Sequence, residues 1–360
     1  MKYTDLAIIG GGPAGLCSAI SAASSGAKVL LIDRNEKLGG QLIKQTHMFF
    51  GSEKQYASKR GFNISEILLD KLNDYKENVE ILNNTTVLGL YEDGVITATK
   101  DEKYVKIKPK ATIIATGASE KVLAFPNNDL PGIYGAGAVQ TLMNVYGIRP
   151  GKKVLMIGAG NIGLIVSYQL MQAGVEVVGI IDAAPKIGGY LVHASKVRRM
   201  GVPILTRYTV KEAIGNDTLE KVVISKLDEN WNPIEGTEEV IETDVMCISV
   251  GLSPLAELLQ QAGCKMMYVP ELGGIAPLRN ENYETTVDSI FVAGDVAGVE
   301  EASSAMVEGY LTGLCAAEKI GFKHENYLEL KKDYRNQLEA LRSGPVGTKI
   351  RSGINKVMGV

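Results

Sequence analysis

The chain has 360 residues, of which 45% are hydrophobic and 40 are glycine, and its formal net charge is −3. This hydrophobic fraction excludes a disordered chain, and the near-neutral charge gives no general attraction to nucleic acid. Every apolar run is shorter than the ~18 residues of a membrane-spanning helix, and the apolar start leads into glycines rather than a cleavage site. We therefore expect a cytoplasmic protein of two or more domains, with no nucleic-acid partner and no membrane span.

The N-terminal segment predicts a strand, a glycine-rich turn, a helix and a second strand. The apolar run Leu6–Ile9 is typical of a strand buried on both faces of a parallel sheet. Gly10, Gly12 and Gly15 follow with GxGxxG spacing, and Asp33 ends the next strand. In dinucleotide-binding folds these glycines allow a tight turn, close approach of the pyrophosphate and close helix packing, while the acid binds ribose hydroxyls.

The middle of the chain repeats this pattern. A predicted helix over 64–76, short strands between 79 and 107, and a strand over 111–115 complete the first copy. The second copy begins with the strand over 153–157, continues through Gly158, Gly160 and Gly163, and has Asp182 at the end of its next strand. An acid there repels the 2′-phosphate of NADP, so NAD is favoured. The nearby Arg198 and Arg199 keep NADP open as the alternative.

The chain after Gly251 predicts a strand over 289–293, closed by Gly294 and Asp295, and a helix over 301–320. Two dinucleotide sites in one chain suggest one bound flavin and one nicotinamide that exchanges. Asp295 is then a candidate ligand of the ribityl chain of the flavin, and the positive end of the helix is a candidate neighbour of the flavin ring. The tail from Lys323 has helical spacing and no evident chemistry.

The cysteines and histidines are too few and too scattered for a metal site. Cys17, Cys247, Cys264 and Cys315 lie in apolar surroundings without CxxC spacing, and there are three histidines. We expect buried, reduced thiols and no metal.

Five segments carry a family resemblance: IIGGGPAG at 8–15, GGQL at 39–42, IIATGAS at 113–119, VLMIGAGNIG at 154–163 and IFVAGDVAG at 290–298. They resemble the thioredoxin reductase-like flavoproteins of the pyridine nucleotide-disulfide oxidoreductase family. The resemblance implies an α/β fold of two Rossmann-like dinucleotide-binding domains, the second inserted into the first. The implied FAD domain is 1–119 with 253–323, the NAD domain is 120–252, and 324–360 form a helical tail.

The same resemblance implies two sets of cofactor-binding residues. Those expected to contact FAD are Gly10, Gly12, Pro13, Ala14, Gly15, Asp33, Arg34, Gly40, Gln41, Thr116, Gly117, Gly294, Asp295 and Ala302. Those expected to contact NAD are Gly158, Gly160, Asn161, Ile162, Gly163, Asp182 and Gly251.

The sequence departs from the family at its redox cysteines. Thioredoxin reductase-like members carry CxxC in the stretch that reads 134–141 here, and glutathione reductase-like members carry cysteines where this chain has Leu42 and His47. A dithiol relay needs thiols, so disulfide reduction is excluded. His47 is a candidate acid–base group beside the flavin, with a structural loop histidine as the alternative.

The segment 117–144 is similar to alpha-type subunits of heteromeric sarcosine-, opine- and proline-oxidising flavoenzymes. This implies hydride transfer between NAD(H) and FAD, with electrons relayed to or from a partner that oxidises an amino acid, amine or similar small substrate. The partner would be another flavoprotein subunit or an electron carrier, in a homo- or hetero-oligomer. Two alternatives stay open: a non-catalytic, nucleotide-loaded assembly subunit, and a stand-alone NADH-dependent reductase or oxidase.

Overall fold

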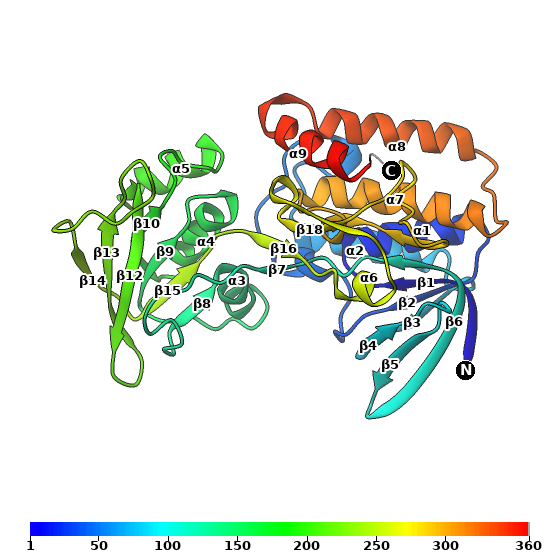
Figure 1. The fold of residues 1–360 in the computed structure, drawn as a ribbon, viewed down its shortest axis with the longest axis horizontal. Coiled ribbons are helices and arrows are strands. Elements are labelled where there is room, and N and C mark those ends of the chain that lie inside the picture. The colour runs from blue at the N-terminus through cyan, green and yellow to red at the C-terminus, as the bar shows by residue number, and fades with distance from the viewer. Residues whose placement is uncertain (359–360) are drawn as a thin grey trace. The chain divides into compact units, whose positions relative to one another are not determined.

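The computed structural model describes residues 1–358, except for the side chain of Val346. The chain divides into two compact units, Met1–Ser119 with Leu252–Val360 (unit 1) and Glu120–Gly251 (unit 2), both visible in Figure 1. The chain passes between the units twice, and the two passages pair as strands β7 (Ala118–Glu120) and β16 (Leu252–Pro254).

Unit 1 is built on a seven-stranded sheet. Its parallel part follows the order β3-β2-β1-β6-β19, and β5 and β4 continue it in antiparallel pairing beyond the first half of β6. The strands are β1 (Lys2–Ile9), β2 (Val29–Ile32), β3 (Val79–Leu82), β4 (Thr85–Leu90), β5 (Ile96–Lys100), β6 (Lys103–Ile114) and β19 (Ile290–Val292). The strand predicted over 111–115 is the end of the longer β6, because β5 pairs with its beginning.

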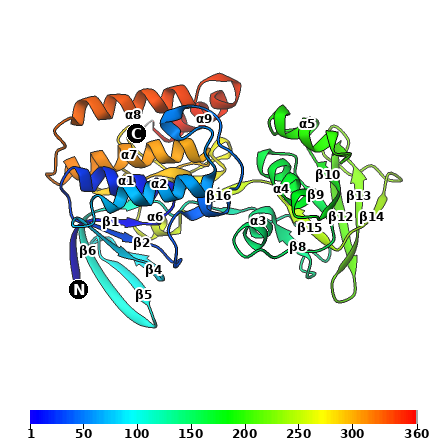
Figure 2. The same cartoon turned by 180° about the vertical axis from the view of Figure 1, so that it is seen from behind.

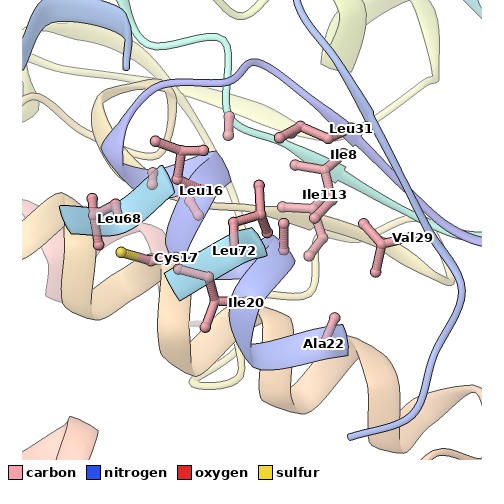
Figure 3. Close-up of a cluster of buried hydrophobic side chains, with 14 of the residues drawn as sticks. Ile8, Leu16, Cys17, Ile20, Ala22, Val29, Leu31, Leu68, Leu72 and Ile113 are labelled. Atoms are coloured by element: carbon pink, nitrogen blue, oxygen red, sulfur yellow. The ribbon is translucent and has the colours of Figure 1, made fainter. Parts of the chain in front are cut away.

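The parallel strands of unit 1 are covered on both faces, which explains their continuous apolar runs. Leu6 and Ile8 face one core, which is formed mainly with α1 and α2. Ala7 and Ile9 face a second core, which is formed with β4, β5 and α6 together with one side of α7. Figure 3 shows side chains of the first core, including Leu16 of α1 and Leu68 of α2. The helices of unit 1 are α1 (Pro13–Ser24), α2 (Gly61–Asn73), α6 (Glu257–Gln261), α7 (Ala302–Lys319), α8 (Tyr327–Leu341) and α9 (Gly344–Val357).

Short elements complete unit 1. They are η1 (Gly40–Lys44), η2 (Glu53–Gln55), η3 (Pro270–Leu272), η4 (Gly294–Val296), β17 (Met266–Val269) and β18 (Gly274–Pro277). The two C-terminal helices belong to this unit: α8 packs on α7, and Ile354 and Val357 of α9 are buried against Val269 and Leu272.

Unit 2 repeats the parallel plan of unit 1. Its sheet has the order β11-β10-β9-β15-β8, all parallel, with helices on one face and a three-stranded antiparallel sheet on the other (Figure 2). Its strands are β8 (Ile133–Gly135), β9 (Lys153–Ile157), β10 (Glu176–Asp182), β11 (Ile204–Thr206), β12 (Tyr208–Gly215), β13 (Leu219–Lys226), β14 (Glu239–Glu242) and β15 (Val245–Ile248). Its helices are α3 (Ala136–Asn144), α4 (Asn161–Gln172) and α5 (Leu191–Arg199). The predicted α/β class with two Rossmann-like units is confirmed.

The four cysteines are free and buried, as predicted. Burial raises the pKa of the Cys17 thiol to about 12 and also raises the pKa of Cys247, so neither forms a thiolate near neutral pH. In the part of the chain that the structure describes, every helix is too short or too polar to span a bilayer.

Candidate nucleotide-binding sites

The first glycine turn joins β1 to α1, and its three motif glycines have different surroundings. A Cβ on Gly10, whose φ is +110°, would lie 2.3 Å from the carbonyl oxygen of Ala115, and one on Gly15 would lie 1.8 Å from that of Gly10. A Cβ on Gly12 would meet nothing nearer than 3.8 Å. Gly10 and Gly15 are therefore required by the packing of the chain itself, whereas the space at Gly12 is open for a ligand.

The second glycine turn, between β9 and α4, repeats this geometry. A Cβ on Gly158, with φ +111°, would lie 2.1 Å from the carbonyl oxygen of Ser249, and one on Gly163 would lie 2.0 Å from that of Gly158. A Cβ on Gly160 would meet no atom within 4 Å apart from its chain neighbours. Each turn leads into the N-terminus of a 12-residue helix, where backbone N–H groups and the helix dipole favour an anion. Both turns therefore fit a pyrophosphate.

The acid at the end of each second strand holds its own glycine turn. Asp33 accepts hydrogen bonds from the N–H of Gly11 at 2.6 Å and from the N–H of Asn35 at 2.7 Å. Asp182 accepts them from the N–H of Ala159 at 2.6 Å and of Ala184 at 2.8 Å. A carboxylate has about four lone-pair sites, so each acid keeps acceptor capacity for a ribose hydroxyl.

A diglycine turn lies against each motif, and sequence reasoning missed the second one. A Cβ on Gly40 would lie 2.7 Å from the Cα of Gly12, and one on Gly189 would lie 2.9 Å from the carbonyl carbon of Gly160. The signal was present, because the runs DRNEKLGGQL at 33–42 and DAAPKIGGYL at 182–191 share the acid, the lysine and the diglycine. The Oδ1 atom of Asn161 also accepts the N–H of Tyr190 at 2.8 Å, which fixes this second turn to the start of α4.

Of the other predicted FAD residues, Gly294 and Pro13 lie at the first turn or at the start of α1, and the positions of Ala302 and Thr116 are also defined. Gly294, with φ +76°, lies against α1, since a Cβ on it would be 2.8 Å from the Cβ of Ala14. Pro13 is the first residue of α1 and Ala302 the first residue of α7. The hydroxyl of Thr116 is engaged, because it donates to the carbonyl oxygen of Leu255 at 2.8 Å.

The remaining predicted residues lie at turns or at the surface. Gly117 and Gly251 directly precede the paired strands β7 and β16, and their φ values of +75° and +117° favour glycine at both positions. Arg34 and Gln41 are exposed, and the Ile162 side chain is 37% exposed at the start of α4.

Asp295 lies in η4, half-buried behind the first turn. One of its carboxylate oxygens accepts the N–H of Glu300 at 3.3 Å. Burial raises the pKa of Asp295, and with the smaller effects of the Glu308 and Glu300 carboxylates it brings that pKa to about 7, against the opposing hydrogen bond from the Glu300 N–H. Near neutral pH this side chain can therefore donate as well as accept a hydrogen bond.

We expect Asp295→Asn to make the flavin-free protein more stable at pH 8 and to have little effect at pH 4. Between the unfolded pKa of 3.8 and the native value of about 7, the native state binds the additional proton, so wild-type stability falls as the pH rises. A shift of about three pH units corresponds to about 4 kcal/mol, an upper bound for this half-buried group. Amide hydrogen exchange of α7 at several pH values measures the effect. Asp70→Asn, at an exposed position on α2, is the control, and an identical pH dependence of D295N and wild type would contradict the assignment.

The loop between η1 and η2 carries His47, the predicted acid–base group. The imidazole stacks on the ring of Phe49, with centroids 5.6 Å apart and the planes 16° apart. Phe49 is buried, whereas Met48 and Phe50 are exposed. Leu42, at the other cysteine position of glutathione reductase-like proteins, is completely buried. The acid–base role of His47 stays a prediction.

Comparisons with known proteins agree with this geometry. The family model described as pyridine nucleotide-disulphide oxidoreductase matches residues 4–309. The sequence is 28% identical over 338 residues to the alpha subunit of sarcosine oxidase from Corynebacterium sp. (strain P-1), covering 89% of this chain and 33% of that protein. It is 26% identical over 328 residues to an opine oxidase subunit from Agrobacterium tumefaciens (strain Ach5), covering 87% and 65%. The chain thus spans a third of the first protein and just under two thirds of the second.

Solved structures show the same architecture. L-proline dehydrogenase from P. horikoshii superposes with a TM-score of 0.70 at 25% identity, covering 94% of this chain and 59% of that one. Thioredoxin reductase from T. acidophilum superposes with a TM-score of 0.71 at 23% identity, covering 88% and 99%. The second likeness concerns the fold alone.

Proposed function

Because the chain belongs to the pyridine nucleotide-disulphide oxidoreductase family, we propose that it is an FAD-dependent oxidoreductase that transfers a hydride between NAD(H) and FAD. In this proposal unit 1 binds FAD and unit 2 binds NAD. The observation that carries it is the repeated glycine turn, in which the middle glycine alone faces open space at the N-terminus of a helix. Such a repeat supports two dinucleotides in one chain.

In unit 1, Gly12 and Gly40 would admit the FAD pyrophosphate to the backbone, and the N-terminus of α1 would bind its charge. Asp33 would accept from the ribose of the adenosine half, and Asp295 would bind the ribityl chain. In unit 2, Gly160 and the N-terminus of α4 would do the same for NAD. When both are bound, the flavin and the nicotinamide supply the hydride chemistry.

NAD is the preferred second nucleotide in this proposal because Asp182 stands where a 2′-phosphate would lie. Its charge repels a phosphate, and Ala183 and Ala184, which follow it, offer no cation. Arg198 and Arg199 are exposed in the last turn of α5, and the NADP alternative depends on these two cations.

We expect Asp182→Asn to improve the affinity for NADP relative to NAD by roughly tenfold, about 1.4 kcal/mol, because it removes the repulsion of the 2′-phosphate. The amide oxygen can accept only one of the two backbone N–H groups that Asp182 binds, but this loss is common to both nucleotides and cancels in the ratio of their affinities. Fluorescence titration of both nucleotides gives the ratio of dissociation constants. Asp33→Asn is the matched variant in unit 1 and should leave that ratio unchanged. A ratio that does not move in D182N would show that the acid does not select the nucleotide.

We further propose that electrons pass to or from a partner flavoprotein subunit that oxidises an amino acid, an amine or a similar small substrate. The matched relatives named as subunits of sarcosine oxidase and opine oxidase support this partner class. The chain's own buried thiols, with raised pKa values at Cys17 and Cys247, do not support disulfide reduction.

The test is anaerobic reduction followed by partner capture. The purified protein should contain FAD, and NADH should bleach its visible absorbance in a rapid-mixing experiment without oxygen. Co-purification from the native source should then recover a second flavoprotein that oxidises an amine or amino acid. Bound FAD that NADH never reduces would overturn the hydride transfer and favour an assembly subunit. Sustained turnover of NADH with a small acceptor by the single chain would overturn the need for a partner.

A further inference from the structure

A cluster of charged side chains is buried in unit 1 behind the Gly294–Asp295 turn. We define this buried charge cluster as Arg279, Tyr283, Glu300, Glu308 and Arg342. The side chains of Glu300, Glu308 and Arg342 are only 7%, 3% and 10% exposed. Because a buried charge is stable only when it is paired, the pairing decides what the cluster does.

Arg342, the residue directly after α8, is the centre of this cluster. Its guanidinium donates from Nη2 to Glu300 at 2.7 Å and from Nε to both oxygens of Glu300 at 3.0 and 3.1 Å. The same Nη2 pairs with Glu308 and donates to the hydroxyl of Tyr283 at 3.2 Å. The second cation, Arg279, stacks on the ring of Tyr283, 5.3 Å from its centroid. Two cations therefore balance two carboxylates.

Two hydrogen bonds join the cluster to the Gly294–Asp295 turn, one through the Glu308 carboxylate and one through the Glu300 backbone. Glu308 accepts the N–H of Gly294 at 2.8 Å through Oε2, and the backbone N–H of Glu300 donates to Asp295 at 3.3 Å. The residue after Glu308 touches α1, since a Cβ on Gly309 would lie 2.2 Å from the carbonyl oxygen of Ala14. Glu308 thus lies directly behind the start of α1, and Glu300 lies next to it through their shared partner Arg342.

Without Arg342, the two carboxylates would face the single cation Arg279, and the remaining net negative charge would oppose the binding of an anionic dinucleotide. Charges in a poorly solvated interior interact strongly, so the acids would repel a pyrophosphate at the N-terminus of α1. Burial raises the pKa of Glu308, and Arg342 is the largest influence in the opposite direction. Arg342 also lies beyond residues 4–309, the part that the family model matches, so the C-terminal segment adds it to the family fold.

We propose that Arg342 is a positioning residue of the FAD site, which together with Arg279 balances the charge of Glu300 and Glu308 behind the Gly294–Asp295 turn and so permits an anionic dinucleotide to bind in unit 1. The inference rests on the proposed function, because it takes FAD as the occupant of that unit. It makes the C-terminal segment a part of the flavin site.

The experiment measures FAD affinity in the full-length protein after removal of bound flavin. FAD is titrated by fluorescence quenching into wild type, Arg342→Met, Arg342→Lys, Glu308→Gln and the double variant Arg342→Met/Glu308→Gln. In the double variant one positive and one negative charge are removed together, and the amide oxygen can still accept the N–H of Gly294. The control is Arg351→Met, because Arg351 is exposed on α9 and bonds to Thr348 of its own helix.

We expect R342M to raise the dissociation constant for FAD at least tenfold, while R342K, the double variant and R351M stay within about threefold of wild type. The visible circular dichroism of bound FAD should change in R342M and return in the double variant, which a loss of stability alone would not produce. If R342M does not fold, the FAD affinities of E308Q and the double variant are compared with that of wild type instead. Both variants should bind FAD as wild type does.

Three results would overturn the inference. They are wild-type affinity in R342M, a loss in R342M that neither R342K nor the double variant restores, and a tenfold loss in the double variant when E308Q alone binds normally. A wild-type protein that binds no FAD at all is a different result, because it contradicts the proposed function itself.

Discussion

Replacing Gly12 by alanine is expected to weaken FAD binding by roughly 10- to 100-fold, the equivalent of about 1–3 kcal/mol for an added methyl group in a filled site. The flavin-free protein should keep its fold, because a Cβ at this position has no neighbour within 3.8 Å. The methyl group would instead occupy the space through which a pyrophosphate reaches the backbone at the start of α1. Flavin content per chain and FAD titration measure the effect.

The matched variant is Gly160→Ala in unit 2. It should weaken NAD binding by a similar factor and leave the FAD content unchanged, and G12A should leave the affinity for NAD unchanged. Each variant is therefore the control for the other. If both variants lose the same nucleotide, or neither loses any, the assignment of one dinucleotide to each unit is wrong.

Replacing Gly309 by valine is expected to destabilise unit 1 by about 3 kcal/mol, the upper part of the range for an overpacked core. A Cβ on Gly309 would lie 2.2 Å from the carbonyl oxygen of Ala14, and one on Gly313 would lie 2.3 Å from that of Ser18. These contacts are with the backbone of α1, so the clash can be relieved only by moving one helix. Since α1 begins at the first glycine turn, FAD affinity should fall as well. Amide hydrogen exchange of α1 and α7 measures the loss.

The control for this variant is Glu318→Val in the same helix. Glu318 is exposed, so the substitution introduces the same β-branched side chain without a clash. It should cost only the difference in helix propensity, roughly 0.5 kcal/mol. Equal exchange rates in the two variants would show that the close crossing of α1 and α7 does not limit the stability of unit 1.

The parts of the fold that could be predicted are those encoded by short sequence patterns. Gly10, Gly15, Gly158 and Gly163 are needed because their Cβ positions are filled by nearby backbone, so their spacing predicts the turn directly. The continuous apolar runs predicted the buried parallel strands for the same local reason. The repeated pattern therefore predicted two similar units without any structure.

The features that could not be predicted depend on contacts between distant segments. Arg342 pairs with Glu300 and Glu308 only after α8 has packed on α7, and its sequence surroundings resemble an ordinary solvated helix. Asp33 was predicted to bind ribose, but its bond to Gly11 became evident only in the folded turn. The second diglycine turn at 188–189 was visible in the sequence but lacked a recognised motif.

The pairing of β7 with β16 has a consequence for how this molecule can be rearranged. Because the chain leaves and re-enters unit 1 through two paired strands, joining Ser119 to Leu252 would remove unit 2 without cutting a strand of either large parallel sheet. Unit 2 is thus one continuous segment that is inserted at a single position in the sequence of unit 1. One duplication followed by one insertion accounts for both the repeated pattern and the split of the host unit. If this segment were exchanged between related genes, the ligand preference of unit 2 could change independently of that of unit 1.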